Sequence, residues 1–248
     1  MADLTGMVPV VVTATLSSGF AVGAGWGIAL DGLLAAQVWG RHKAQLRADG
    51  VEVPRLVEQA QPIDLALPLA RCGRGSDWHW AATCAWPVPP DAGGAGGDPV
   101  RDVRTWTGRI DERICRQLSG AEGVIPVHHG RWRHRLMPVV VTLCTAVRWR
   151  AVGDPMRLTQ LLAPIAAIGK KRSQGEGNVL RWEVWADPDG EEWEFGHLHP
   201  DGALGRPAPA GCVAGRDVPH AGVGAAGIRP PYTHVARQRS LLRPVPLP

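Results

Sequence analysis

Segments with strand-like and helix-like patterns alternate along this chain, and their order predicts an α+β fold. Residues 8–16 are apolar and β-branched, as in a strand with both faces partly covered, and residues 28–46 place apolar side chains on one helical face. The same pair of patterns returns as a strand over 137–153 and a helix from residue 155. An alternating strand over 178–186 completes a split β-α-β arrangement of the ferredoxin-like (RRM-like) kind.

The middle of the chain is predicted to hold two short strands and an excursion. The strands are expected within 62–70 and 77–88, where β-forming residues gather. The Gly/Pro-rich stretch 89–99 has no core-forming residues, which predicts a flexible break between the elements on either side. Residues from about 101 to 136 are arginine-rich and poorly periodic, which indicates an excursion from the domain.

The second helix has clear boundary signals. Asp154 is a good N-cap, Pro155 suits the first helical position, and Pro164 is expected to kink the helix or end it early. After the last predicted strand, "DPDG" at 187–190 indicates a turn, and "EEWEFGHL" at 191–198 is expected to be its hairpin partner.

These elements predict one elaborated domain over residues 1–198. Residues 199–248 are rich in Gly, Pro and Ala and end in the basic stretch "GIRPPYTHVARQRSLLRPVPLP". Such a stretch has little to pack on by itself. It is therefore expected to be an extended tail docked on a partner chain.

The net positive charge of the chain favours binding of polyanions, but the basic residues are unevenly distributed along the sequence. The net charge is +4 and the isoelectric point is near 9.0. The first forty residues contain no Lys or Arg, whereas residues 101–150 hold ten arginines. The basic surface is therefore expected to be confined to one part of the molecule.

Cysteine usage and the apolar N-terminus indicate a cytoplasmic protein. The five cysteines have no C-x-x-C spacing, so they suggest neither a disulfide framework nor a zinc knuckle. The apolar start lacks a cationic segment and is broken by Thr, Ser and Gly, so it reads as a buried strand and loop rather than a signal peptide. No membrane association is expected.

The most informative stretch is "IGKKRSQGEG" at 168–177. The chain has 24 arginines and three lysines, and two of the lysines, Lys170 and Lys171, stand side by side here. Glycine lets a backbone approach a phosphate chain closely, and lysine is a mobile point charge for phosphates. Phosphate binding and a merely solvated turn are both compatible with this pattern.

Two nucleotide-binding patterns do not fit. A Walker loop ending at Gly169 and Lys170 needs glycine at position 164, which is proline, and Ser or Thr at position 171, which is lysine. The "GAGWG" stretch at 23–27 has its final glycine at the wrong spacing for a dinucleotide fingerprint. No cofactor is therefore expected.

The element order, with a basic glycine-rich loop before the last strand, resembles the RAMP superfamily of CRISPR-associated RNA-binding proteins. "IGKKRSQGEG", "GDPMRLTQLL" at 153–162 and "RPPYTH" at 229–234 resemble more closely the small RAMP subunit of type IV CRISPR effector complexes. The resemblance covers most of 8–186, and the tail only in one short motif.

The resemblance implies a non-catalytic subunit of an antiviral ribonucleoprotein. It would cap the five-prime end of a guide RNA and dock the adjacent, repeated backbone RAMP subunit, with a large subunit as a further candidate partner. It implies no homo-oligomer. Glu176 departs from the family pattern and puts an acid beside the expected phosphates. The loop residues onto which the RNA-binding role carries over are Lys170, Lys171, Arg172, Ser173, Gln174, Gly175 and Gly177.

A second basic group lies in the excursion, which the resemblance identifies with the thumb of RAMP subunits. "HHGRWRHR" at 128–135 combines cations with an indole, which suits phosphate contacts and base stacking, although a solvated basic loop gives the same pattern. No carboxylate or cysteine has a spacing that matches its histidine pair, so no metal site is expected. The residues expected to contact RNA or a partner subunit are Arg131, Trp132, Arg133 and Arg135.

The alternative function is a metal-independent RNA-processing endonuclease of the same superfamily, and a free-standing RNA-binding protein is the third hypothesis. Histidine general acid–base chemistry would then rest on His42 or His79. Neither has a tyrosine or a second histidine nearby in sequence. Tyr232, the single tyrosine, is expected to serve docking.

Overall fold

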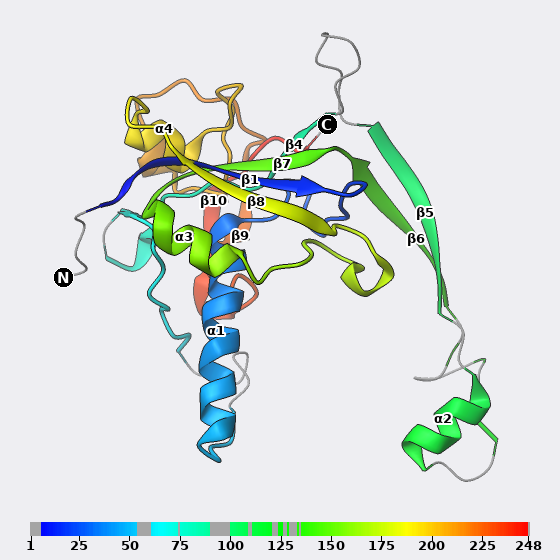
Figure 1. The fold of residues 1–248 in the computed structure, drawn as a ribbon. Coiled ribbons are helices and arrows are strands. Elements are labelled where there is room, and N and C mark those ends of the chain that lie inside the picture. The colour runs from blue at the N-terminus through cyan, green and yellow to red at the C-terminus, as the bar shows by residue number, and fades with distance from the viewer. Residues whose placement is uncertain are drawn as a thin grey trace.

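The computed structural model describes residues 6–53, 61–73, 75–89, 100–108, 111–120, 124–125, 128, 133 and 135–247. Its centre is a four-stranded sheet in which all neighbouring strands are antiparallel (Figure 1). The strands lie in the order β4 (Trp86–Val88), β7 (Ala146–Gly153), β1 (Val8–Leu16) and β8 (Val179–Ala186). The fold is α+β, as the sequence predicts.

Two helices cover one face of the sheet. Alternate residues of β1 point to this face, and their apolar side chains pack with those of α1 (Leu30–Ala48) and α3 (Pro155–Leu162) in the main core. The Asp154 carboxylate accepts hydrogen bonds from the backbone N–H groups of Met156 (3.0 Å) and Arg157 (3.1 Å). The predicted cap is confirmed, and the helix ends just before Pro164, as expected.

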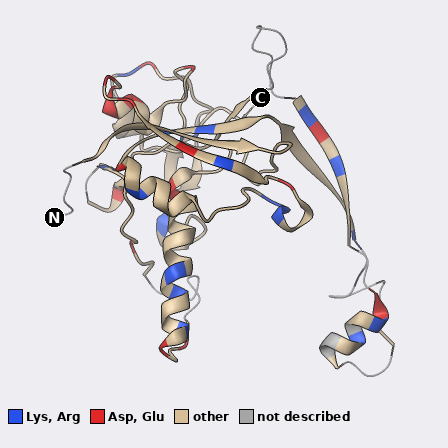
Figure 2. Ribbon diagram, in the orientation of Figure 1, with Lys and Arg blue, Asp and Glu red and all other residues tan. Residues whose placement is uncertain are grey.

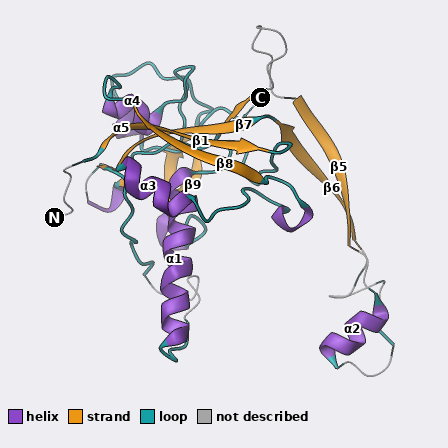
Figure 3. Cartoon of the chain, in the orientation of Figure 1, coloured by secondary structure: helices purple, strands orange, loops and turns teal. Residues whose placement is uncertain are grey.

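The opposite face is covered by α4 (Glu192–His197), and α5 (Ala210–Val213) lies beside α4 (Figure 3). The sequence predicts a strand over 191–198, and this prediction is wrong. The turn at 187–190 forms, with Gly190 N–H donating to the Asp187 carbonyl over 3.1 Å. The Glu191 side chain then accepts from the backbone N–H of Glu194 (2.9 Å), which caps a helix that buries Phe195.

The segment before β4 has less strand than predicted. β2 (Arg71–Cys72) and β3 (His79–Trp80) form a short hairpin around a 3-10 turn at Gly75–Asp77. The predicted strand over 62–70 is reduced to one bridge, between Leu69 and Gly153. Apolar residues here are buried as an irregular edge of the main core rather than as a regular ladder.

The excursion is a long antiparallel ribbon that leaves the sheet (Figure 1). It consists of β5 (Val100–Gly108) and β6 (Arg135–Leu143), with α2 (Glu112–Ser119) beyond its far end. The single strand predicted over 137–153 is therefore two strands, β6 and β7, which separate at residues 144–145. The apolar pattern runs through this point unbroken, so it does not reveal that the chain changes its pairing partner from β5 to β1.

The C-terminal segment differs from the expected extended tail. Its hairpin of β9 (Val223–Gly227) and β10 (Gln238–Leu242) and the turns around it form two small apolar clusters of their own. Leu247 reaches back into the main core. Among the described residues, no helix combines the length and apolar character that crossing a bilayer requires.

A buried polar network attaches this segment to α1. Tyr232 donates its hydroxyl proton to the Asp31 carboxylate (2.5 Å), and the Arg206 guanidinium lies 3.8 Å from the same carboxylate. Arg206 also donates to the carbonyls of Ala82 (3.0 Å) and Ile228 (3.1 Å). Burial works against the charged form of Arg206, but Asp31, with smaller contributions from Tyr232, Cys84 and Cys212, outweighs it, and the pKa of Arg206 is raised. Tyr232 thus does serve docking, within its own chain.

Candidate functional site

The glycine loop joins α3 to β8 and is tightly folded. Its centre is a 3-10 turn at Arg172–Gln174. Lys171 stands just before this turn in the left-handed region, with φ 60°, and it is the one non-glycine residue with positive φ in the described part of the chain. Left-handed backbone costs a lysine roughly 1–2 kcal/mol, so the contacts around Lys171 must hold it there.

Two glycines of the loop are needed for different reasons. A Cβ at Gly177 would lie 2.0 Å from the Ile168 carbonyl oxygen, so glycine is required there by the packing of the loop on itself. Gly175 has φ 89° and open space around its missing side chain. The close backbone approach that the sequence suggested for both is therefore available to an outside ligand only at Gly175.

The rest of the loop presents its polar groups outward. Lys170, Arg172, Ser173 and Gln174 are exposed, while Lys171 is half-buried. The ammonium of Lys171 lies 3.7 Å from the ring centroid of Trp106 on β5, a cation–π contact. Figure 2 shows basic residues on the loop and on the ribbon beside it.

Glu176 is neutralised by the ribbon. Arg104 on β5 donates from one guanidinium nitrogen to both carboxylate oxygens of Glu176, over 2.8 and 3.0 Å. Hydrogen bonding to Glu176 raises the pKa of Arg104, which also pairs with Asp102 at 3.2 Å. The negative charge of Glu176, which would disfavour a nearby phosphate, is thus compensated by Arg104. The same ion pair joins the loop to the ribbon.

Two cavities open beside the loop. One of about 220 Å³ lies between loop and ribbon and is lined by Arg104, Trp106, Lys171 and Gln174 among others. A larger one of about 660 Å³ lies on the other side of the loop, where Arg172 and Trp26 contribute to the wall. The loop therefore has room on both sides for a polyanion and for a planar group.

Of the second predicted group, the structure describes Arg133 and Arg135. Arg131 and Trp132 lie outside the described residues. Arg133 is exposed, and Arg135 begins β6 opposite Gly108, at the end of the ribbon away from the sheet. The loop instead meets Arg104 and Trp106, two ribbon residues that sequence reasoning missed. The sequence did hold a signal for them: Arg104 and Trp106 are two residues apart in a segment of strand-forming residues, so their side chains are expected on the same face of a strand.

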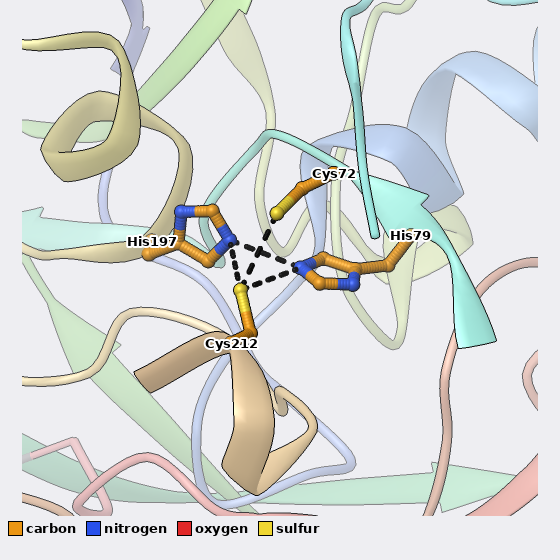
Figure 4. A group of neighbouring side chains, drawn as sticks. All are labelled: Cys72, His79, His197 and Cys212. Atoms are coloured by element: carbon orange, nitrogen blue, oxygen red, sulfur yellow. Dashed lines mark hydrogen bonds between the residues drawn. The ribbon is translucent and has the colours of Figure 1, made fainter. Parts of the chain in front are cut away.

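A separate group of side chains gathers on the opposite face of the sheet (Figure 4). The ligand-type atoms of Cys72, His79, His197 and Cys212 all lie within 4.8 Å of one another. The two histidine Nε2 atoms are 3.0 Å apart, and Cys212 Sγ lies 3.3 Å from Cys72 Sγ and 3.2 Å from His197 Nε2. Both histidines are buried and both cysteines are half-buried.

Trp193 holds one half of this group in place. Its backbone carbonyl accepts a hydrogen bond from His197 Nδ1 (2.7 Å), and its ring stacks on the His197 imidazole at an interplanar angle of 12°. Its indole N–H donates to the carbonyl of Cys212 (3.1 Å). α4 and α5 are thereby fixed relative to each other at the two side chains that face the cluster.

Cys72 differs from the other described cysteines, including its neighbour Cys212, because their pKa values are raised and its own is lowered. Hydrogen bonding from Cys212 and the two imidazoles lowers the pKa of Cys72, because its thiolate is the acceptor. Burial raises the pKa of Cys144 to about 12, and burial is also the main cause that raises the pKa of Cys84 to about 12. Burial also lowers the pKa of His79 to about 4, which keeps its imidazole neutral at physiological pH.

Sequence reasoning missed this cluster because its members are far apart in the chain. Cys72 and His79 are paired across the β2–β3 hairpin, whereas His197 and Cys212 lie more than a hundred residues later. A search for C-x-x-C spacing, and for ligands near the histidine pair at 128–129, does not find them. Only the fold brings the two pairs together.

The two histidines proposed for the endonuclease alternative, His79 and His42, differ in their exposure to solvent. His79 is fully buried in the cluster, where a bound RNA has no access to it. His42 is exposed on α1, beside Trp39, with the ring centroids 5.3 Å apart. Among the described residues, the histidine next to His79 is the equally buried His197, so this alternative gains no acid–base pair that RNA could reach.

Comparisons with known proteins add no family. No protein-family model matches the chain, and no curated protein matches it either.

Proposed function

We propose that this chain is a non-catalytic RNA-binding subunit of a CRISPR-type ribonucleoprotein, which caps the five-prime end of a guide RNA and docks the adjacent backbone subunit. The strand order β4-β7-β1-β8, with α1 following β1 and α3 following β7, is the order of a ferredoxin-like split β-α-β domain. This order supports the resemblance to RAMP proteins.

The observation that carries the proposal is the attachment of the glycine loop to the ribbon. Lys171 sits on Trp106 and Glu176 pairs with Arg104, so the loop has a fixed shape without a ligand. Lys170 and Arg172 remain exposed on this fixed loop, next to the open approach at Gly175. Preorganised cations and accessible amides are what a terminal phosphate or the first nucleotides of a strand require.

The face of the ribbon that points away from the loop supports the proposed docking of the adjacent backbone subunit. Arg104 and Trp106 point to the loop, and because side chains alternate along a strand, the neighbouring positions point away from it. Val103, Leu136 and Val140 on this outer face are 64, 72 and 53% exposed. A two-stranded ribbon with an uncovered apolar face is marginal by itself in water. The adjacent backbone subunit is the partner that we propose for it.

Co-expression with the neighbouring genes tests the whole proposal. The chain is purified through a tag, and the proteins and RNA that accompany it are sequenced. Repeated backbone subunits with short RNAs that share their five-prime ends are expected. A lone monomer without RNA would overturn the proposal, and RNA on a lone chain would favour a free-standing RNA-binding protein instead.

Charge reversal tests the loop itself. Lys170→Glu, Lys171→Glu and Arg172→Glu together should weaken binding of a short single-stranded RNA and reduce the slope of log affinity against log salt by about 2, since each single-strand phosphate contact contributes about 0.7. The matched control reverses Lys43, Arg47 and Arg157 on α1 and α3. Equal losses in both variants would show a general charge effect and remove the loop from the site.

A further inference from the structure

The cluster on the opposite face of the sheet is built like a metal site. We propose that Cys72, His79, His197 and Cys212 bind one Zn²⁺ ion through two thiolates and two imidazole nitrogens. The inference is independent of RNA binding, because no described residue of the glycine loop or the ribbon takes part in the cluster.

The spacing of the four atoms fits tetrahedral coordination. Zn–S bonds of about 2.3 Å and Zn–N bonds of about 2.0 Å place the ligand atoms roughly 3.3–3.8 Å from one another. The cluster has 3.0 Å between the two Nε2 atoms, 3.2 and 3.8 Å from Cys212 Sγ to His197 and His79, and 3.3 Å between the sulfurs. These four separations are within about half an ångström of the tetrahedral values, and the remaining two, from Cys72 Sγ to the histidine nitrogens, lie within 4.8 Å.

The donor atoms also have the right orientation. His197 donates its Nδ1 proton to the Trp193 carbonyl, which leaves Nε2 as the nitrogen that can ligate a metal, and Nε2 points into the cluster. His79 is fully buried, and its Nε2 faces the same point (Figure 4). A hydrogen-bonded carbonyl behind a histidine ligand is the usual way to fix its tautomer.

Metal-free explanations account for less of this arrangement. The two sulfurs are 3.3 Å apart, well beyond the disulfide bond length of about 2.05 Å. Without a cation, the single lone pair of His197 Nε2 faces two neighbours at once, His79 Nε2 and Cys212 Sγ. A central cation satisfies all four of the atoms that face one another, the two Nε2 and the two Sγ atoms.

The donor set selects zinc and a structural role. Two thiolates and two imidazoles in a tetrahedron are a common set for structural Zn²⁺, and the total charge of ion and ligands is zero, which suits burial. Four protein ligands leave no position for substrate. The two thiol protons leave to solvent as the metal binds.

The site would join two regions that are distant in sequence. Cys72 and His79 belong to the β2–β3 hairpin, while His197 ends α4 and Cys212 lies in α5. A bound ion therefore fastens the start of the C-terminal segment to the domain. Loss of the ion should loosen this segment and leave the glycine loop in place.

Metal analysis of the unmodified protein is the first test. The full chain is expressed in zinc-containing medium, dialysed and analysed for metal, and a second sample is reconstituted with Co²⁺. About one zinc per chain is expected, together with the thiolate charge-transfer and ligand-field bands of tetrahedral Co²⁺. No uptake of either metal, Co²⁺ spectra without thiolate bands, or a Cys72–Cys212 disulfide in the freshly purified protein would each overturn the proposal.

Ligand variants locate the ion. Cys212→Ala should weaken Zn²⁺ binding by at least about 100-fold, since even outer-shell changes cost 10–100-fold. Cys144→Ala is the matched control, because it removes another described cysteine that lies outside the cluster and should keep the full metal content. Equal metal in both variants would place the ion elsewhere. Wild-type metal content remains decisive if Cys212→Ala does not fold.

Discussion

The glycine loop and the C-terminal segment are stabilised in opposite ways. The loop is one contiguous stretch whose shape depends on its own backbone and on two contacts with the ribbon, Lys171 with Trp106 and Glu176 with Arg104. The C-terminal segment has little regular structure and is held by side chains distant in sequence, such as Arg206 beside Asp31. Local sequence can encode the first kind of site, whereas the second exists only after the chain has folded.

The largest loss of stability is expected when Asp31 is replaced. Asp31→Ala leaves the buried Arg206 guanidinium without its countercharge, which should lower the free energy of unfolding by about 3–5 kcal/mol. For a domain of this size the melting temperature should fall by about 6–20 °C. Asp49→Ala, at the exposed end of the same helix, is the control and should change stability by less than about 0.5 kcal/mol. Thermal unfolding of both measures the difference, and similar melting temperatures would show that the network contributes little.

Within the loop, two glycine substitutions should destabilise the protein to different extents. Gly177→Ala combines positive φ with a clash against the Ile168 carbonyl, so it should cost about 2–4 kcal/mol. Gly175→Ala has no clash and should cost only about 1 kcal/mol, because alanine disfavours positive φ. Urea denaturation of the two variants tests the order. If Gly175→Ala is the more destabilising, the loop is packed differently from the arrangement described.

The smallest effect on stability is expected at Trp106. Trp106→Ala removes the cation–π contact with Lys171, which is worth about 0.5–1 kcal/mol at a partly exposed site. RNA affinity should fall more clearly, because Lys171 loses the contact that holds it in the left-handed region. Trp185→Ala, which removes an exposed indole from β8, is the control. Fluorescence polarisation with a labelled RNA compares the two, and unchanged affinity for Trp106→Ala would separate the ribbon from RNA binding.

The sequence predicted those parts of the fold whose signals are local. β1, α1, α3 and β8 follow from periodicity and from the Asp154–Pro155 start signal, and the loop residues from lysine placement. It failed where an element depends on its surroundings. Residues 191–198 alternate like a strand but become a helix, because the Glu191 cap and the burial of Phe195 on the sheet decide the conformation.

The residues of the candidate sites also fall into two groups: those that local sequence indicates and those that only the fold brings together. Lys170, Arg172 and Gly175 were recognisable from the sequence, although the role of Gly177 in packing was not. The ribbon partners of the loop, and all four members of the cysteine–histidine cluster, required the fold. No spacing rule links Cys72 to Cys212, because 139 residues of chain lie between them and the β2–β3 hairpin and α5 meet only in three dimensions.

The two unlike faces of the ribbon constrain how this protein can change in length. Strand side chains alternate strictly, so deleting or inserting a single residue in β5 would turn Arg104 and Trp106 outward and bring Val103 and its neighbours against the loop. A change of two residues would restore the original orientation. Natural variants of the ribbon should therefore differ in length by even numbers of residues between the sheet and the loop contacts.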